Sequence, residues 1–372
     1  MADRHIPMYQ QVFDELKQQI MDKVYVPDQA FPGLDELTAR FQTSAITVRR
    51  ALTELAGEGL IYRIRGKGTF VSPEDQLSAA GRKVGLLGLK RIYMGFPGST
   101  PLLNSDKYFS DLMAGIDSMC EQLGVELYYW DYLHKPDFPE EDNTGIILVP
   151  DVSLPIEVLK RWKEENRPFI TVHFYYPHLQ IPYVIVDNLT GGYLATQHLL
   201  TLGHKRIGII LTGNSLYDLN QEFSLRLQGY KLALQLNNIP FDEKLVIIKS
   251  SSSEREEMGY EGMTALLDTE NPPTAVFATS DVKAMGCIKA CHDRGISVPE
   301  QMSIVGYDDL RISPYIYPGL TTVNQNTFKM GTRAVEILCE YWDKEESSGG
   351  VTKEEIVPQL VVRGSTAGLV IR

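Results

Sequence analysis

Hydroxyl and guanidinium side chains gather in one short stretch near the amino end of the chain. The stretch TSAITVRRALTEL (Thr43–Leu55) carries them within about two helical turns, at Ser44, Thr47, Arg49 and Arg50. The major groove of duplex DNA admits one helix whose first turns bring short donors and cations to bases and phosphates. The stretch therefore fits a recognition helix, although a solvated charged helix with a satisfied cap would carry the same residues.

A second group of cations follows that stretch. Arg65, Gly66, Lys67 and Gly68 lie between two runs of strand-forming residues, so they predict the tip of a Gly-rich hairpin. A basic hairpin beside a basic helix has few uses other than holding phosphates. We therefore expect Arg65, Gly66 and Lys67 to contact DNA together with the helix.

The net charge of −12 argues at first against a polyanionic partner. The charge is unevenly spread, however, because Lys and Arg balance Asp and Glu from Met1 to Ser72 and the rest of the chain carries the whole excess. Salt screens distant charges, so a locally basic region still attracts phosphate. We expect an acidic body behind a DNA-binding tip.

Few residues suggest a metal or a catalytic centre. The cysteines are Cys120, Cys287, Cys291 and Cys339. Cys287 and Cys291 lie one helical turn apart beside His292, a spacing that would suit a metal ion. Structural zinc, however, needs four ligands at closer spacing. The simpler interpretation is that the two cysteines are small apolar residues on a buried helix face. HExxH, GxSxG and P-loop motifs are absent from the sequence. We expect reduced thiols, no metal, no cofactor and no enzyme activity.

The elements that would position the basic groups form a first domain. Its expected helices are Met8–Lys23, Leu34–Phe41 and Ala45–Gly57, and its expected strands are Leu60–Ile64 and Thr69–Ser72. Three helices and a hairpin predict a winged helix-turn-helix domain over residues 1–72. A polar segment without periodicity follows, and we expect residues 73–82 to be a linker.

Apolar runs alternate with amphipathic segments through residues 83–372. The first run is Val84–Leu89, and a second set of strands and helices begins at Tyr183–Val186. Short apolar strands between helices predict an α/β fold with two parallel sheets, whose ligands bind at the carboxyl ends of the strands. No apolar run approaches a membrane span, and the charged amino end lacks the apolar core of a signal peptide. We therefore expect a cytoplasmic protein with no membrane partner.

Several motifs of the first domain occur in a familiar order. They are ELTARF at Glu36–Phe41, TVRRAL at Thr47–Leu52, EGLIYR at Glu58–Arg63 and GKGTFV at Gly66–Val71. With these motifs, residues 7–71 resemble the GntR-type winged helix. Two positions depart from that family, because Asp35 stands where a basic residue is common and Ala45 where arginine is common. These departures leave the helix and hairpin residues named above as the DNA contacts and leave the operator sequence open.

Other motifs cover nearly all of residues 83–372. They include VDNLTGG at Val186–Gly192, RLQGYKLAL at Arg226–Leu234, PTAVFATSD at Pro273–Asp281, GISVPEQMSIVGYDDL at Gly295–Leu310 and LTTVNQ at Leu320–Gln325. They resemble the LacI/GalR effector domain, which is similar to periplasmic sugar-binding proteins. A GntR-type reader joined to a LacI-type sensor is the arrangement of the arabinose repressor group, which this chain resembles.

The resemblance implies two lobes joined by crossovers near Asp187, Val323 and Lys344, with a ligand cleft between them. Lobe 1 would comprise residues 83–186 and 324–344, and lobe 2 would comprise residues 187–323 and 345–372. By motif position, the resemblance implies ligand contacts by Arg226, Asp281, Asp308 and Gln325. A surface salt bridge for Arg226 and a helix cap for Asp281 are the alternatives.

Lobe 1 would supply the opposite wall of the cleft. The resemblance implies that Lys90, after the first strand, and Tyr108 and Phe109, at the start of the first helix, line it. His173 ends an apolar strand before a crossover and would also face the ligand. A solvated lysine, core aromatics and a satisfied core histidine are the alternatives.

Carboxylates, a guanidinium, an amide and aromatic faces together suit a sugar. The expected function is a transcriptional repressor of sugar-utilisation genes, whose affinity for double-stranded operator DNA is switched by arabinose or another monosaccharide. Two-fold operators call for a homodimer. A nucleoside or other non-sugar ligand remains an alternative. A pyridoxal-phosphate enzyme-like regulator is a weaker one, because the lysine and arginine motifs of that family are missing.

Overall fold

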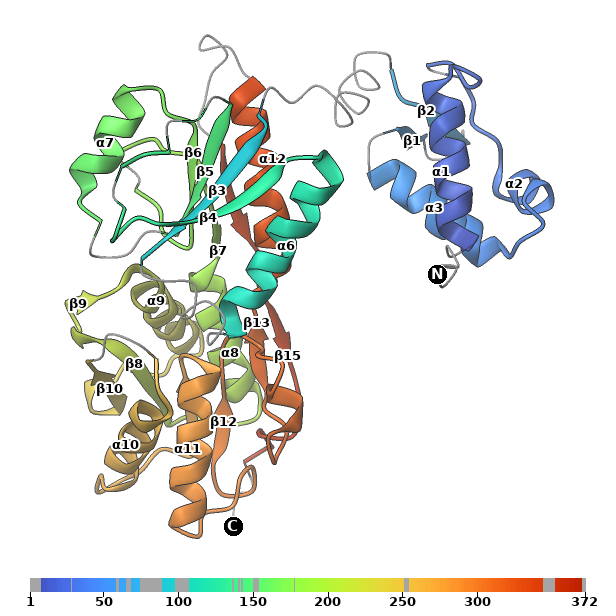
Figure 1. Cartoon of the computed structure of the whole chain (residues 1–372). Coiled ribbons are helices and arrows are strands. Elements are labelled where there is room, and N and C mark those ends of the chain that lie inside the picture. The colour runs from blue at the N-terminus through green and yellow to red at the C-terminus, as the bar shows by residue number, and fades with distance from the viewer. Residues whose placement is uncertain are drawn as a thin grey trace, which may run out of the picture. The chain divides into compact units, whose positions relative to one another are not determined.

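The computed structural model describes residues 8–27, 29–57, 60–64, 68–73, 89–97, 107–135, 137–139, 141, 143–149, 154–176, 178–250, 254–343 and 352–369. The chain divides into two compact units, Met1–Leu87 and Gly88–Arg372 (Figure 1). Of the predicted linker, residues 73–82, only the first residue lies in the described part of the chain, so its extent stays a prediction.

The first unit consists of helices and a hairpin. The helices are α1 (Met8–Met21), α2 (Leu34–Arg40) and α3 (Ala45–Gly57), and the strands are β1 (Ile61–Ile64) and β2 (Gly68–Val71). The strands pair antiparallel, from Ile61 opposite Val71 to Ile64 opposite Gly68. This arrangement confirms the predicted winged helix-turn-helix fold, with two of the helix ends shifted inward by one or two residues.

Apolar spacing explains how these helices pack. α1 buries Val12, Phe13, Leu16 and Ile20, which recur every three or four residues and so share one face. That face meets buried α3 residues, including Val48 and Leu55, in a single cluster. Arg49 and Arg50 on α3 are exposed, so packing turns the charged side of this helix outward.

The second unit contains two parallel sheets, as predicted. The first sheet has the strand order β14 (Lys353–Ile356), β7 (Tyr183–Val186), β6 (Phe169–Val172), β5 (Thr144–Leu148), β3 (Arg91–Phe96) and β4 (Glu126–Asp131). Its helices are α6 (Lys107–Leu123), α7 (Ile156–Glu164) and α12 (Thr327–Asp343) (Figure 1). Ile146 and Leu148 of β5 pack against α7, whereas Gly145 lies against Leu338 of α12, so the two helices cover opposite faces.

The second sheet has the strand order β10 (Val246–Lys249), β8 (Ile207–Ser215), β11 (Ala275–Ala278) and β12 (Ser303–Val305), with β9 (Asp218–Leu219) antiparallel to β8. The helices on one face are α8 (Asn188–Thr201) and α9 (Gln221–Leu236), and those on the other are α10 (Glu256–Leu267) and α11 (Asp281–Asp293). The short helices η1 (Glu243–Leu245) and η2 (Ser313–Tyr315) and the antiparallel pair β13 (Thr322–Asn324) and β15 (Gln359–Val361) complete the unit. Because the four main strands are parallel, their carboxyl ends share one edge.

Strand β14 corrects the predicted lobe boundary. The third crossover was expected near Lys344, with residues 345–372 in lobe 2. Instead, β14 pairs in parallel with β7 in the first sheet, from Lys353 opposite Tyr183 to Ile356 opposite Val186, and only the later β15 joins β13. The sequence KEEI buries only Ile356, so its apolar pattern is too weak to predict a strand.

Candidate functional site

A side chain caps the amino end of α3. Ser44 Oγ accepts a hydrogen bond from the backbone N–H of Thr47 at 3.2 Å, and the two hydroxyl oxygens lie 2.8 Å apart. This cap satisfies one of the amide groups that a helix start leaves open. Ser44 is exposed and Thr47 is half-buried, so the capped turn lies at the surface of the first unit.

Arg49 and Arg50 lie outside the buried face of α3, and both are exposed. The guanidinium carbon of Arg50 lies 3.6 Å from the ring centroid of Tyr9 on α1. A guanidinium stacked on an aromatic ring uses its flat face and keeps its N–H edges for carboxylate or phosphate. Tyr9 therefore holds Arg50 in a defined position on the surface.

The predicted hairpin contacts Arg65, Gly66 and Lys67 lie outside the described residues. The flanking strands β1 and β2 have the antiparallel register that the prediction requires. The roles of these three residues stay a prediction.

Arg226 lies at the carboxyl edge of the second sheet and is only 3% exposed. Its Nε donates to Asn188 Oδ1 at 2.8 Å, and its Nη1 donates to the carbonyl oxygen of Thr279 at 2.6 Å. The guanidinium carbon lies 3.7 Å from the ring centroid of Tyr307. Lobe 2 thus fixes the guanidinium on two sides, which excludes the predicted alternative of a surface salt bridge.

Asp308 and Gln325 meet beside this arginine. Gln325 Nε2 donates to Asp308 Oδ1 at 2.5 Å. Asp308 has a φ of 115°, a conformation that costs free energy in any residue but glycine and that persists mainly at functional sites. Burial raises the pKa of the Asp308 carboxyl well above its usual value, and the positive charge of Arg226 opposes that rise. Arg226, Asp308 and Gln325 therefore come together at the carboxyl edge of the second sheet.

Asp281 lies at the same sheet edge but points into the protein. Its carboxylate accepts hydrogen bonds from the Leu310 backbone N–H at 2.9 Å and from the hydroxyls of Ser313 and Thr322, each at 2.5 Å. Burial raises the pKa of Asp281 to about 6, against the effect of these donors. Because the protein's own donors surround it, the structure favours a structural role over ligand contact. The helix cap belongs to Ser280 instead.

His173 and Phe109 are the residues of the predicted lobe 1 wall whose side chains the structure describes. Their ring centroids lie 5.6 Å apart in an edge-to-face arrangement. Burial, and then the positive charge of Arg226, lowers the pKa of His173 to about 3. His173 therefore carries a neutral imidazole and interacts electrostatically with Arg226 of lobe 2.

The prediction for Lys90 is wrong. It precedes β3, whose first residue is Arg91, so it lies at the amino end of the first sheet and not at the carboxyl edge. The apolar run Val84–Leu89 suggested a strand that ends before Lys90, but the described strand begins after it. Tyr108 lies in the first turn of α6, and its side chain lies outside the described residues.

Sequence reasoning also missed residues that hold the site together. Asn188 and Tyr307 orient Arg226, and both stand in motifs, VDNLTGG and VGYDDL, that carried the resemblance. Glu254 and Lys283 form an ion pair at the same edge and stand in no motif that would have revealed it. They are joined only because parallel strands end side by side.

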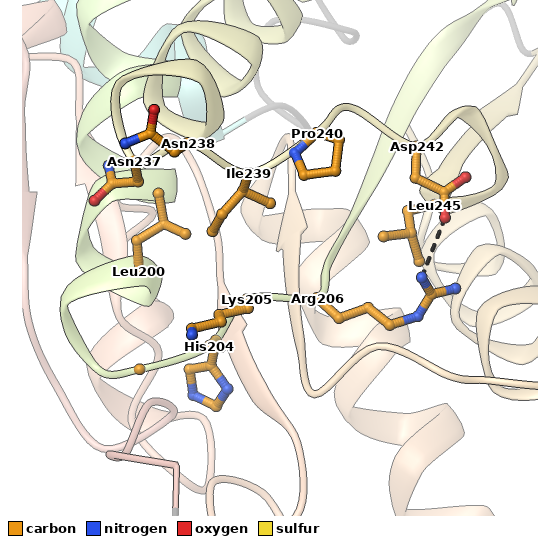
Figure 2. A pocket seen from close by; sticks show the side chains of 11 residues that line it. Leu200, His204, Lys205, Arg206, Asn237, Asn238, Ile239, Pro240, Asp242 and Leu245 are labelled. Carbon is orange, nitrogen blue, oxygen red and sulfur yellow. Dashed lines mark hydrogen bonds and ion pairs between the residues drawn. The ribbon is translucent and has the colours of Figure 1, made fainter.

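A pocket of about 540 Å³ opens at the other end of lobe 2 (Figure 2). It lies among the ends of α8 and α9 and the start of β8, and includes Lys205, Arg206 and Asn238. Arg206 already donates to Asp242 across it at 3.1 Å and to the carbonyl of Asn271 at 2.6 Å. None of the predicted ligand residues lines this pocket.

The described residues contain no cluster of His, Cys, Asp and Glu that would hold a metal ion. All four cysteines are buried, and burial raises the pKa of the Cys291 thiol to about 12. In the part of the chain that the structure describes, no helix is long and apolar enough to cross a bilayer.

Comparisons with known families divide the chain in the same way. Residues 8–71 match the family described as bacterial regulatory proteins, gntR family, and residues 196–366 match the periplasmic binding protein-like domain. The arabinose metabolism transcriptional repressor of Geobacillus stearothermophilus is 27% identical over 387 residues, covering 98% of this chain and 99% of that protein.

Other relatives share the larger unit. The HTH-type transcriptional repressor PurR of Actinobacillus pleuropneumoniae serotype 3 (strain JL03) is 30% identical over 269 residues, covering 70% of this chain and 78% of that protein. A LacI family transcriptional regulator from Enterococcus faecium, solved with bound ribose, has a TM-score of 0.62 at 26% identity and covers 76% of this chain and all of that one. These homologues are regulators and not enzymes. The chain therefore belongs to the bacterial transcriptional repressors that join a GntR-type winged helix-turn-helix domain to a LacI-type, periplasmic-binding-protein-like effector domain.

Proposed function

We propose that this repressor senses a monosaccharide, arabinose or another, bound between the two lobes of its larger unit, and that the sugar sets its affinity for operator DNA. The observation that carries the proposal is that Arg226, Asp308 and Gln325 gather in one group, and that the charge of Arg226 also acts on His173, which packs against Phe109. Donors and acceptors suit vicinal hydroxyls, and aromatic faces suit the C–H side of a sugar ring.

The names of the relatives support the class of ligand. One is an arabinose metabolism repressor, and a structural neighbour was solved with ribose. Because a repressor must reach duplex DNA, we also propose that the molecule acts in the cytoplasm.

A panel of ligands tests this proposal. The melting temperature of the purified chain would be measured with L-arabinose, D-ribose, D-galactose, D-glucose and adenosine. A ligand at 100 times its Kd stabilises a protein by about 2.7 kcal/mol. We expect one sugar to raise the melting temperature of the wild type. Asp308→Asn should show no such rise, whereas Lys289→Gln, on the exposed side of α11, should show the same rise as the wild type. Stabilisation by adenosine alone, or by no compound, would contradict the proposal.

We propose that Ser44, Thr47, Arg49, Arg50, Arg65, Gly66 and Lys67 contact duplex DNA. The capped start of α3 and its exposed cations support this. The test replaces Arg49 and Lys67 by glutamate. We expect DNA affinity at physiological salt to fall by a factor on the order of ten or more, with a shallower salt dependence, because phosphate contacts are lost.

A control variant with the same change in net charge separates the effect of local charge on DNA binding from that of the total charge. Lys205→Glu with Lys289→Glu changes the larger unit by the same amount. If both double variants bound a labelled duplex equally well, the helix and hairpin would not be the DNA-binding surface.

We propose that the repressor is a homodimer. Large aromatic side chains are exposed on the larger unit: Tyr128 and Tyr129 on β4, an edge strand, and Tyr315 and Tyr317 around η2. Exposed aromatic groups of this size are typical of protein interfaces. Sedimentation of the wild type at the mass of two chains, and of Tyr315→Ser with Tyr317→Ser at a lower mass, is the expected result; a monomeric wild type would contradict it.

A further inference from the structure

A buried ion pair stands beside Arg226 and Asp308 at the carboxyl edge of lobe 2. The Lys283 side chain, in the first turn of α11, is 0% exposed, and its Nζ donates to Glu254 Oε2. Glu254 lies just before α10 and its side chain is 30% exposed. The Lys283 nitrogen also lies 4.4 Å from the ring centroid of Phe223. The lysine is thus sealed in the protein while its partner reaches the surface of this edge.

Three donors hold the Glu254 carboxylate. The hydroxyl of Thr212, on β8, donates to Oε1, while Ser280 Oγ, after β11, donates to Oε2 at 2.7 Å. Lys283 supplies the third bond, also to Oε2. Burial raises the pKa of Glu254, but the charge of Lys283 and these hydrogen bonds outweigh it, so the pKa lies below its usual value. Glu254 is therefore ionised at neutral pH and fixed in direction.

Stability alone does not account for this pair. Burying an ion pair commonly costs about as much free energy as the attraction between the charges returns, so such a pair is weak evidence for a stabilising role. A carboxylate has about four acceptor positions, and three are used here, with Oε1 taking only Thr212 in the described contacts. A fixed carboxylate whose side chain is 30% exposed and that has an acceptor position beyond the described contacts suits a ligand hydroxyl.

The pair also belongs to the same charged cluster as the proposed sugar site. Asp308 interacts electrostatically with both Glu254 and Lys283, and Lys283 interacts with Arg226. The cluster thus contains two cations and two carboxyl groups on one wall. Such alternating charges suit an uncharged ligand that both donates and accepts hydrogen bonds, and they would repel a phosphorylated one at Glu254.

We propose that Glu254 accepts a hydrogen bond from a hydroxyl of an uncharged sugar, and that Lys283 is a positioning residue that holds this carboxylate in place. The proposal rests on the proposed function, since it concerns the same cleft. It adds a specificity determinant outside the residues that the sequence motifs predict.

The test separates ligand contact from folding. Variants Glu254→Gln, Lys283→Met and the double variant would be compared for ligand-free melting temperature and for calorimetric Kd with L-arabinose, D-ribose, D-galactose, D-glucose and D-ribose 5-phosphate. We expect Glu254→Gln to melt lower, because it leaves the Lys283 ammonium without its counter-ion. The double variant should recover the melting temperature yet bind the sugar about tenfold more weakly, because the acceptor remains lost.

The matched control is Glu261→Gln, which removes the partner of Lys249 in an exposed pair of the same lobe. Its sugar affinity should stay within about twofold of the wild type. A double variant that recovers the affinity as well as the stability would overturn the proposal, and so would preferential binding of D-ribose 5-phosphate. If the wild type bound none of the sugars, both this proposal and the proposed function would be overturned. If the wild type bound a sugar and the double variant bound it with the same affinity, only the proposal for Glu254 would be overturned.

Discussion

His173 is a neutral imidazole held under strain. Its φ of 70° lies in the left-handed region, which costs a residue with a side chain on the order of 1–3 kcal/mol and is kept where the surroundings demand it. Those surroundings are the ring of Phe109 and the charge of Arg226. A histidine with only a packing role would need neither the strained backbone nor a cation nearby, so we interpret His173 as a fixed wall of the ligand cleft.

The lowered pKa of His173 makes stability depend on pH. Its folded-state pKa of about 3 lies below the unfolded value of 6.5. The unfolded chain therefore binds more protons between these values, and the contribution of His173 to stability is complete above pH 6.5 and is lost as pH falls toward 3. Between pH 6.5 and 5 the loss is on the order of 2 kcal/mol.

The measurement is the melting temperature of the wild type and of His173→Phe at pH 7 and pH 5. We expect the wild type to lose more stability than the variant over this interval. Burial also lowers the pKa values of His198 and His204, so both proteins will lose stability between pH 7 and pH 5. Only the difference between their losses reports on His173. Equal losses would show that the imidazole is already solvated in the folded state.

Motif position predicted residues that the structure brings to the carboxyl edge of the second sheet, but not where their side chains point. Asp281 and Lys283 lie two residues apart on the same helix start, and both turn toward partners far along the chain: Thr322 for Asp281, and Glu254 for Lys283. Such pairings depend on which strands are neighbours in the sheet. A linear pattern contains no information about that order, and so Asp281 was predicted as a ligand contact and Lys283 was not predicted at all.

At the scale of elements, α8 and α9 form the platform beneath Arg226. The two helices cross at facing glycines. A Cβ on Gly192 would lie 2.2 Å from the Arg226 carbonyl oxygen, and one on Gly229 would lie 2.1 Å from that of Leu189. Only glycine permits backbones to approach this closely, and the approach sets the depth of Arg226 in the lobe.

We predict that Gly229→Ala pushes these helices apart. Overpacking of this kind costs on the order of 1–3 kcal/mol, and it should weaken sugar binding as well, because Arg226 stands one turn away on the displaced helix. Gly319→Ala is the control, since its Cβ would meet the nearest atom at an ordinary 3.5 Å. Chemical denaturation and sugar titration of both variants provide the comparison; an unchanged midpoint for Gly229→Ala would mean that α8 and α9 adjust freely.

Element types were predictable from the sequence, whereas their exact placement was less so. The helices of the first unit and most strands of the second follow from apolar periodicity, because buried faces repeat at fixed intervals. The run Val84–Leu89, which lies outside the described residues except for Leu89, has a similar apolar content to β3, so the pattern alone did not predict a strand that begins after Lys90. That ambiguity put Lys90 at the wrong end of the lobe, and the mostly charged β14 gave no signal at all.

At the scale of the whole effector unit, side chains make direct contacts between the two lobes. The Gln221 side chain, at the start of α9, accepts from the Tyr175 backbone N–H at 3.0 Å and donates to the Tyr175 carbonyl at 3.1 Å. Arg311 of lobe 2 also donates to Asp111 of lobe 1 at 2.6 Å, between exposed side chains. The contact between Gln221 and Tyr175 should hold the lobes together more strongly than the ion pair, because exposed ion pairs contribute little to stability.

We predict that Gln221→Ala destabilises the closed arrangement. Two hydrogen bonds are worth about 0.5–1.5 kcal/mol each, and a ligand that binds only the closed form loses apparent affinity in proportion to the fraction that remains closed. The sugar Kd should rise on the order of tenfold, whereas Asp111→Ala should change it by less than about twofold. Calorimetry on both variants measures the sugar Kd. A larger rise in Kd for Asp111→Ala would show that the ion pair, and not the Gln221 contact, holds the lobes together.

The same variant tests whether lobe closure is the switch. Coupling between sugar and DNA is reciprocal, so a change that acts only on closure must move the sugar concentration needed to alter DNA binding by the same factor as the sugar Kd. Titration of sugar into the repressor–DNA complex of Gln221→Ala gives that concentration directly. If the Kd rises but the midpoint of the DNA response stays at the wild-type value, the sugar acts on the winged helix through something other than closure of the lobes.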